Sequence, residues 1–198
     1  MRVSVFDYGA GNLHSLVKAL ARPGVAVCVE PDPVRAVETD VLVLPGVGAF
    51  GAAAARLAAG QRVMRAALNA GLPCLAICLG MQLLFDESEE GAGTGLGLIP
   101  GRVRRLHARR VPQIGWNALE ERCDPLLAAS ALEVAYFANG YVCEPRDARV
   151  VRAWSTHEGE RFPTMVRVGR TVGVQFHPEK SSRPGVAFAR AFLEEVGT

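Results

Sequence analysis

The chain has 198 residues, of which 49% are hydrophobic and 21% charged, with a formal net charge of +2. These values exclude a disordered or fibrous protein, and the small charge gives no reason to expect a nucleic-acid partner. The length suits one sizeable core, so we expect a single domain over residues 1–198. Only residues 102–110 are locally basic, and we interpret them as a charged strand or hairpin edge rather than as a phosphate-binding surface. No aromatic residues interleave with the arginines, which argues against binding of a single nucleic-acid strand.

Apolar runs in the sequence are shorter than the roughly 20 residues that cross a bilayer, and the first residues lack the apolar region of a signal peptide. We therefore expect a cytoplasmic location and no membrane partner. Five cysteines without a CxxC motif are then expected to be reduced. Residues 157–160 (HEGE) lack the second histidine of a zinc-binding HExxH helix, and the glycine-rich residues 91–97 do not follow a strand, so we expect no metal and no cofactor.

Strand and helix patterns alternate through the first half of the chain. A β-rich run at residues 2–7 is followed by a glycine-bearing turn and then by helical spacing over residues 13–22. Further apolar runs typical of strands occupy residues 25–30, 40–45 and 73–77. Asp32 is a possible N-cap for one or two helical turns between the first two of these runs. Continuous Val, Leu and Ile strands between helical segments predict a doubly wound, flavodoxin-like α/β fold with helices on both faces of the sheet.

The second half carries mainly β patterns, at residues 133–142, 150–155, 164–168 and 171–176. Gly169 and Arg170 separate the last two runs and suit a tight hairpin. Residues 184–196 then read as a C-terminal helix with Pro184 near its start. We therefore predict a mixed sheet with additional antiparallel strands in the second half.

Cys78 ends an apolar run and is followed by Leu79, Gly80 and helix-compatible residues 81–88. This order is typical of a nucleophile elbow, a strained strand-to-helix turn that exposes a reactive side chain. Ala76 and Gly80 are small enough for such a turn, and a helix N-terminus favours the thiolate. The alternative is that Cys78 is a small buried hydrophobic residue, an interpretation that also fits the other four cysteines.

His177 is the strongest candidate for a base among the four histidines. It follows the apolar run at residues 171–176, Pro178 stiffens the turn, and Glu179 is close enough to orient an imidazole. Alone, His177 could simply cap the end of a strand. Because both Cys78 and His177 follow strands, at the edge where open α/β sheets bind ligands, we predict a Cys-His-Glu triad.

Residues 45–48 (PGVG) follow another strand at the same predicted edge. Their flexible backbone could direct N–H groups at a developing oxyanion, with the Leu79 N–H as a second donor. The alternative is an ordinary turn between a strand and a helix.

The motifs PGVG, ICLGMQ and FHPE, in this order, resemble those of the class I (triad) glutamine amidotransferases, and the similarity extends over essentially the whole chain. Residues 7–12 (DYGAGN), 112–117 (PQIGWN), 136–141 (YFANGY) and 176–182 (FHPEKSS) are similar to the glutaminase subunits of imidazole glycerol phosphate synthases. The resemblance implies one type 1 glutamine amidotransferase domain with the class I architecture.

The resemblance also implies a role for each site residue. Cys78 would attack the side-chain amide of glutamine, His177 would pass the proton to ammonia, and Glu179 would orient His177. The amino-acid end of glutamine would contact Gly48, Gln82, Glu90, Gly140 and Tyr141. The oxyanion hole would be formed or framed by Gly46, Val47 and Leu79.

The resemblance implies a partner as well. The chain would form a heterodimer with a cyclase, a (β/α)8-barrel subunit that receives the ammonia. The barrel would make imidazole glycerol phosphate and an aminoimidazole carboxamide ribonucleotide in histidine biosynthesis. The family pattern places the turn at residues 7–12, the GWN segment, Tyr136 and Lys180 at or near the interface.

Four positions depart from the family pattern. Glycine is usual at Ala76, histidine is usual at Gln113 and Asn139, and Ser or Thr is usual at Gly140. None of these is a triad member. At Gly140 we expect glutamine to contact the backbone rather than a hydroxyl group.

Three alternative functions stay open on the sequence. The chain could be the glutaminase subunit of another synthase, such as a pyridoxal phosphate, guanylate or anthranilate synthase. It could be a stand-alone cysteine hydrolase of the related flavodoxin-like type. It could also be a noncatalytic binding or scaffold subunit with an inert core cysteine.

Overall fold

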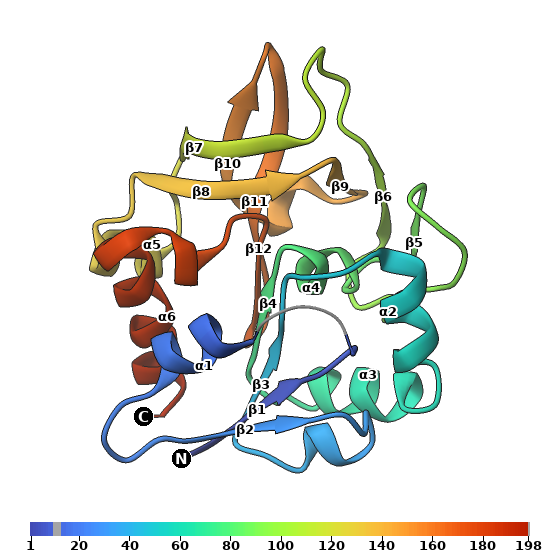
Figure 1. Ribbon diagram of the computed structural model, residues 1–198, viewed down its shortest axis with the longest axis vertical. Helices are drawn as coiled ribbons and strands as arrows, with labels where there is room; N and C mark the ends of the chain where they lie inside the picture. The colour runs from blue at the N-terminus through green and yellow to red at the C-terminus, as the bar shows by residue number, and fades with distance from the viewer. Residues whose placement is uncertain (10–12, 198) are drawn as a thin grey trace.

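The computed structural model describes residues 1–9 and 13–197 (Figure 1). Within these residues the central sheet has seven strands, in the order β10-β11-β12-β4-β3-β1-β2. The strands are β1 (Arg2–Phe6), β2 (Ala26–Glu30), β3 (Val41–Leu44), β4 (Cys74–Ile77), β10 (Val151–His157), β11 (Glu160–Val168) and β12 (Thr171–Val174). Strands β2, β1, β3, β4 and β12 are parallel, in the order of a flavodoxin-like sheet, whereas β11 pairs antiparallel with both β12 and β10. The predicted fold class is confirmed.

Helices cover both faces of this sheet. One core contains side chains of α1 (His14–Leu20), α5 (Pro125–Ser130) and α6 (Ser182–Val196). The other contains side chains of α2 (Phe50–Leu57), α3 (Gln61–Asn69) and α4 (Leu79–Gln82). None of the helices over the described residues is long and apolar enough to span a bilayer.

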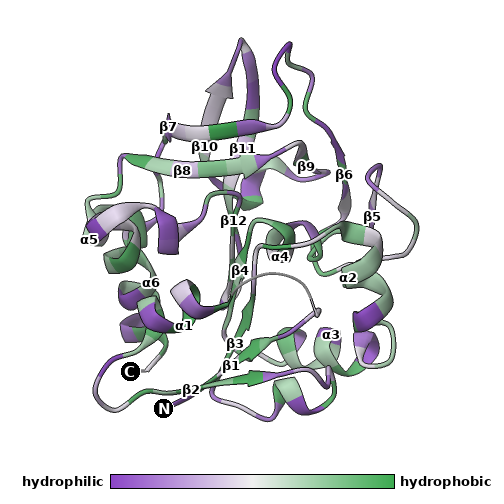
Figure 2. Ribbon diagram, in the orientation of Figure 1, coloured by the Kyte–Doolittle hydropathy of each residue, from purple (hydrophilic) through white to green (hydrophobic). Residues whose placement is uncertain are grey.

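Strand β3 shows why the inner parallel strands are largely apolar. All four of its residues are buried, with Val41 and Val43 in the core on one side and Leu42 and Leu44 in the core on the other. Side chains alternate between the faces of a strand, so a strand covered on both faces needs a continuous apolar run. Figure 2 shows the resulting hydrophobic centre along β1, β3 and β4.

The antiparallel part lies beyond one end of the parallel strands (Figure 1). One small sheet contains β5 (Glu87–Ser88), β6 (Gly101–Arg105) and β9 (Tyr141–Pro145), and β7 (Gln113–Ala118) pairs with β8 (Val134–Asn139). The basic strand β6 lies between β5 and β9 rather than at an edge, and Arg102 pairs with Glu144 at 2.7 Å. The predicted hairpin turn at Gly169 is confirmed, with φ of 55° at that glycine.

Three short 3₁₀ segments complete the described elements, at Arg35–Val37, Ala148–Val150 and Pro178–Lys180. The first takes the place of the helical turns predicted after Asp32. The N-cap of this segment is Val34 rather than Asp32; the Asp32 carboxylate accepts a hydrogen bond from Val34 N at 2.8 Å and so closes the turn just before the segment.

The helix predicted after Cys78 is shorter than the sequence indicates. It ends at Gln82, and Glu87 already belongs to β5. Leu83, Leu84 and Phe85 are fully buried, so the segment lacks the exposed face of an amphipathic helix. Their carbonyls accept hydrogen bonds from the N–H groups of residues 96–99, which replace the bonds of a longer helix.

Candidate active site

Cys78 occupies a strained turn between β4 and α4. Its φ of 48° and ψ of −103° are unusual for a residue with a side chain. The turn is fixed because Cys78 N donates to Val174 O at 2.6 Å. A Cβ atom on Gly80 would lie 2.2 Å from Leu44 O, so the turn requires glycine there, as the sequence indicates. The strand, turn and helix therefore have the form of a nucleophile elbow.

His177 and Glu179 follow the neighbouring strand β12. Val174 pairs in register with Ile77, so the residues after both strands leave the sheet at the same edge. The buried imidazole donates its Nδ1–H to Glu179 Oε1 at 2.8 Å. Burial alone would lower the pKa of His177, but hydrogen bonding and charge from Cys78 and Glu179 outweigh it and raise the pKa from 6.5 to about 10. The ring is therefore protonated at neutral pH.

Gly46, in the loop after β3, separates the nucleophile from the base. A Cβ atom on Gly46 would lie 2.9 Å from Cys78 Cβ and 2.9 Å from His177 Cε1. The two side chains therefore border the same small space, which only a glycine leaves open.

A cavity of about 250 Å³ contains Cys78 and His177. The other predicted site residues in its wall are Gly46, Val47, Gly48, Leu79, Gln82, Glu90, Gly140 and Tyr141. Of the predicted site residues only Glu179 is outside the wall, and its carboxylate is bonded to Nδ1 of His177. Ala138, Asn139 and Lys180 also line the cavity, although the sequence did not predict them as glutamine contacts.

Two side chains of the cavity wall are held by backbone groups. Glu90 Oε2 accepts from Phe50 N at 2.8 Å, and Phe50 is the first residue of α2. Gln82 Nε2 donates to Tyr141 O at 3.4 Å. The wall therefore carries an oriented carboxylate and an oriented amide, which suit the charged end of an amino acid. The N–H groups at the start of α4, including that of Leu79, have no partner within the helix.

Gln175 is a site residue that the sequence reasoning missed. Its side chain is fully buried, and its Nε2 donates to Cys78 Sγ at 3.4 Å. The signal was present, since Gln175 is the polar residue in the run VGVQF and stands two positions before His177. Ala138 was also missed, and its carbonyl oxygen lies 4.0 Å from Cys78 Sγ.

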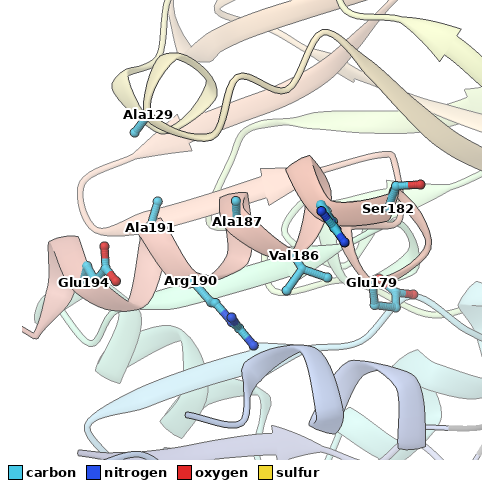
Figure 3. A pocket seen from close by; sticks show the side chains of 9 residues that line it. Ala129, Glu179, Ser182, Val186, Ala187, Arg190, Ala191 and Glu194 are labelled. Carbon is cyan, nitrogen blue, oxygen red and sulfur yellow. The ribbon is translucent and has the colours of Figure 1, made fainter. Parts of the chain in front are cut away.

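A larger groove of about 980 Å³ runs along α6 (Figure 3). Its wall includes Arg190, Glu194 and, at one end, Glu179. Cys78 is not part of this wall, so a molecule in the groove would not reach the thiol. We assign the candidate active site to the smaller cavity for that reason.

Comparison with known proteins identifies a family over nearly the full chain. The family described as "Glutamine amidotransferase class-I" matches residues 4–196. The imidazole glycerol phosphate synthase subunit HisH of a Thermus thermophilus strain is 42% identical over 98% of this chain and 99% of its own length. The HisH subunits of Acaryochloris marina and Pyrococcus furiosus are 41% and 39% identical, over 98% and 96% of this chain and 94% and 97% of their own lengths.

Solved structures agree with the fold. The structure described as PurLQS from Thermotoga maritima has a TM-score of 0.74 and 18% identity, and the match covers 98% of both chains. A glutamine amidotransferase from Thermotoga maritima has a TM-score of 0.63 and 20% identity, over 100% of this chain and 84% of that one. The predictions of family, fold and enzyme class are confirmed. The chain belongs to the class-I glutamine amidotransferase family, and within that family to the group of HisH subunits of imidazole glycerol phosphate synthase.

Proposed function

We propose that this chain hydrolyses glutamine with Cys78, His177 and Glu179, and that it passes the ammonia to the cyclase subunit of an imidazole glycerol phosphate synthase. The observation that carries the proposal is the strained turn at Cys78, which shares one cavity with a buried His177 whose Nδ1 is bonded to Glu179 outside the cavity wall. The HisH relatives of about 40% identity support the assignment to this synthase.

The reaction begins with attack by the Cys78 thiolate on the side-chain carbonyl carbon of glutamine. A C–S bond forms, and the carbonyl oxygen becomes negative. When the C–N bond breaks, protonated His177 gives its proton to the departing nitrogen, which leaves as ammonia. A water molecule then loses a proton to His177 and hydrolyses the thioester, which releases glutamate and restores Cys78. Glu179 fixes the imidazole through Nδ1, so Nε2 is the nitrogen that transfers the proton.

Glutamine binding is proposed at the remaining cavity residues. The carboxylate of Glu90 attracts the α-ammonium group, while Gln82 and the backbone at Gly140 and Tyr141 hold the other polar groups. Gly46, Val47 and Leu79 form or frame the oxyanion hole, and Gly48 contacts the amino-acid end. In the synthase the cyclase subunit supplies the ammonia acceptor.

An exposed apolar surface beside the cavity supports a protein partner. Ile114 and Trp116, on one face of β7, are 68% and 55% exposed. The Trp116 ring packs edge-on against Tyr136 of β8, and Lys180 Nζ lies 5.9 Å from the centre of the Tyr136 ring. Aromatic and apolar side chains of this kind are typical of interface anchors. We propose that this surface binds the (β/α)8 cyclase in a heterodimer; residues 10–12 of the predicted interface turn lie outside the described residues.

The proposal includes a cytoplasmic location and a single type 1 glutamine amidotransferase domain over residues 1–198. It includes no metal, cofactor or nucleic acid.

The decisive experiment measures glutamate release by the full chain alone, with a cyclase partner, and with the cyclase and its nucleotide ligand. We expect slow release alone and strong stimulation in the complex. Equal release in all three conditions would contradict the proposal, and vigorous amide hydrolysis by the isolated chain would favour a stand-alone hydrolase. Stimulation by a different synthase partner instead would identify another glutaminase subunit.

A further inference from the structure

Three side chains form a chain of polar contacts that ends at the nucleophile. Gln82 Nε2 donates to Tyr141 O at 3.4 Å and to Gln175 Oε1 at 3.5 Å. Gln175 Nε2 donates in turn to Cys78 Sγ at 3.4 Å. Asn139 Nδ2 also donates to Tyr141 O, at 3.1 Å, so two amides converge on this carbonyl.

The Tyr141 carbonyl determines how the side-chain amides of Gln82 and Gln175 are oriented. A backbone carbonyl can only accept, so Gln82 must point its NH₂ group toward it. That NH₂ group also lies beside Gln175, which therefore presents its carbonyl oxygen to Gln82. The remaining end of the Gln175 amide, its NH₂ group, is then the end that reaches Cys78 Sγ.

Burial strengthens the hydrogen bond from the Gln175 NH₂ group to Cys78 Sγ. Gln175 is fully buried, Gln82 is 5% exposed, and Gln175 N is held by Thr164 O at 2.9 Å. A hydrogen bond to a charged sulfur is stronger where water is excluded, and a fixed amide loses little entropy when it forms one.

From these contacts we propose that Gln175 stabilises the Cys78 thiolate, and that Gln82 and the Tyr141 carbonyl keep its NH₂ group aimed at Sγ. The inference rests on the proposed function, and it assigns to the reaction a residue outside the Cys-His-Glu triad. The hydrogen bond from Gln175 stabilises the thiolate before it attacks glutamine. It acts again when hydrolysis of the thioester releases the sulfur as a thiolate.

The test is the rate at which iodoacetamide alkylates Cys78 in the full chain, followed by mass spectrometry of the Cys78 peptide. Gln175→Met keeps the shape of the side chain and removes the donor. We expect its alkylation rate at pH 7 to fall at least about tenfold. His177, Glu90 and Lys180 are the charged residues in the wall of the same cavity, and all three are unchanged in the variant. At pH 7, well below the pKa of about 10 of His177, variant and wild type therefore differ in the Gln175 donor.

Two further variants separate donation from packing. Gln175→Leu changes the packing more than Gln175→Met does, but it removes the same donor and adds no charge, so we expect a similar fall in alkylation at pH 7. Thr164→Val is the matched control, because Thr164 is fully buried beside Gln175 and its hydroxyl has no partner among the described residues. We expect it to alkylate at the wild-type rate.

A wild-type alkylation rate at pH 7 in either folded Gln175 variant would overturn the inference. A wild-type Cys78 that reacts no faster than the exposed Cys28 would instead refute the proposed function on which the inference rests.

Discussion

His177 Nδ1 lies 2.8 Å from Glu179 Oε1, which commits one nitrogen of the ring to the carboxylate and leaves the other for Cys78. This bond and the charge of Cys78 together hold a proton on a buried imidazole. The protonation of His177 therefore depends on both Glu179 and Cys78, and its change with pH can be predicted.

The pKa of His177, raised to about 10, links stability to pH. Because the folded-state pKa is above the ordinary value of 6.5, the stabilisation is complete below about pH 6.5 and is lost as the pH rises through about 10. In Cys78→Ala one raising partner is gone, so we expect a lower pKa for His177. Histidine NMR titration of both proteins measures this difference. A His177 that titrates near 6.5 in the wild type would contradict the imidazolium assignment.

Cys78→Ala is expected to abolish glutamine-dependent synthesis by the complex, with a loss of at least about a thousandfold, because no other group supplies the attacking sulfur. Ammonia-dependent synthesis by the same complex is expected to continue at the normal rate, since the cyclase chemistry does not use this thiol. Product formation with glutamine and with ammonium salts separates the two activities. Loss of both would refute the proposed division between subunits.

Gly46→Ala tests the space between the nucleophile and the base. The new methyl group would meet Cys78 Cβ, His177 Cε1 and Ile77 O at 3.0 Å or less, so one of the side chains must move. We expect glutaminase activity in the complex to fall about a hundredfold or more, because misplacement by about 1 Å is enough for such a loss.

Gly91→Ala is the matched control for this substitution. A Cβ atom there would lie 3.4 Å from Gly51 N, which is an ordinary contact. We expect the control to keep most of the activity, and melting curves of both variants report folding. Full activity in Gly46→Ala would show that the two side chains do not share this space during the reaction.

Trp116→Ala is expected to weaken the complex with the cyclase at least about tenfold, because large exposed aromatic side chains are frequent interface anchors. Val63→Ala is the control, since Val63 is also exposed, at 43%, but lies on α3. Titration calorimetry with the purified subunits measures both affinities. Equal affinities in Trp116→Ala and the wild type would place the interface elsewhere.

Periodicity and turn residues predicted the main sheet well, because its inner parallel strands are buried on both faces and largely apolar, and several of its turns carry Gly or Pro. The length of α4 was not predictable in this way. Its end depends on Leu83, Leu84 and Phe85 being enclosed on all sides and bonded to a distant loop, and neither condition has a local pattern.

The triad and the PGVG loop could be predicted because each part has its own motif at the end of a strand. The place of Gln175 in an apolar run marks it as unusual, but its contact with Cys78 could not be assigned from the sequence, since a glutamine there is equally compatible with a strand end facing solvent. Its contact with Cys78 depends on the pairing of β12 with β4, which brings together residues far apart in the sequence.

That pairing has a consequence for how proteins of this kind can diverge. The spacing of Cys78 and His177 is fixed by two adjacent strands in register, whereas the exposed apolar face of β7 lies in the long segment between these strands. No residue of β7 is in the cavity wall, and β7 pairs with β8 rather than with β12 or β4. Substitutions on the exposed face of β7 can therefore change the partner surface without moving the nucleophile or the base. A slip of β12 by one residue would instead turn each of its side chains to the other face of the sheet, and Gln175 would no longer point at the thiol.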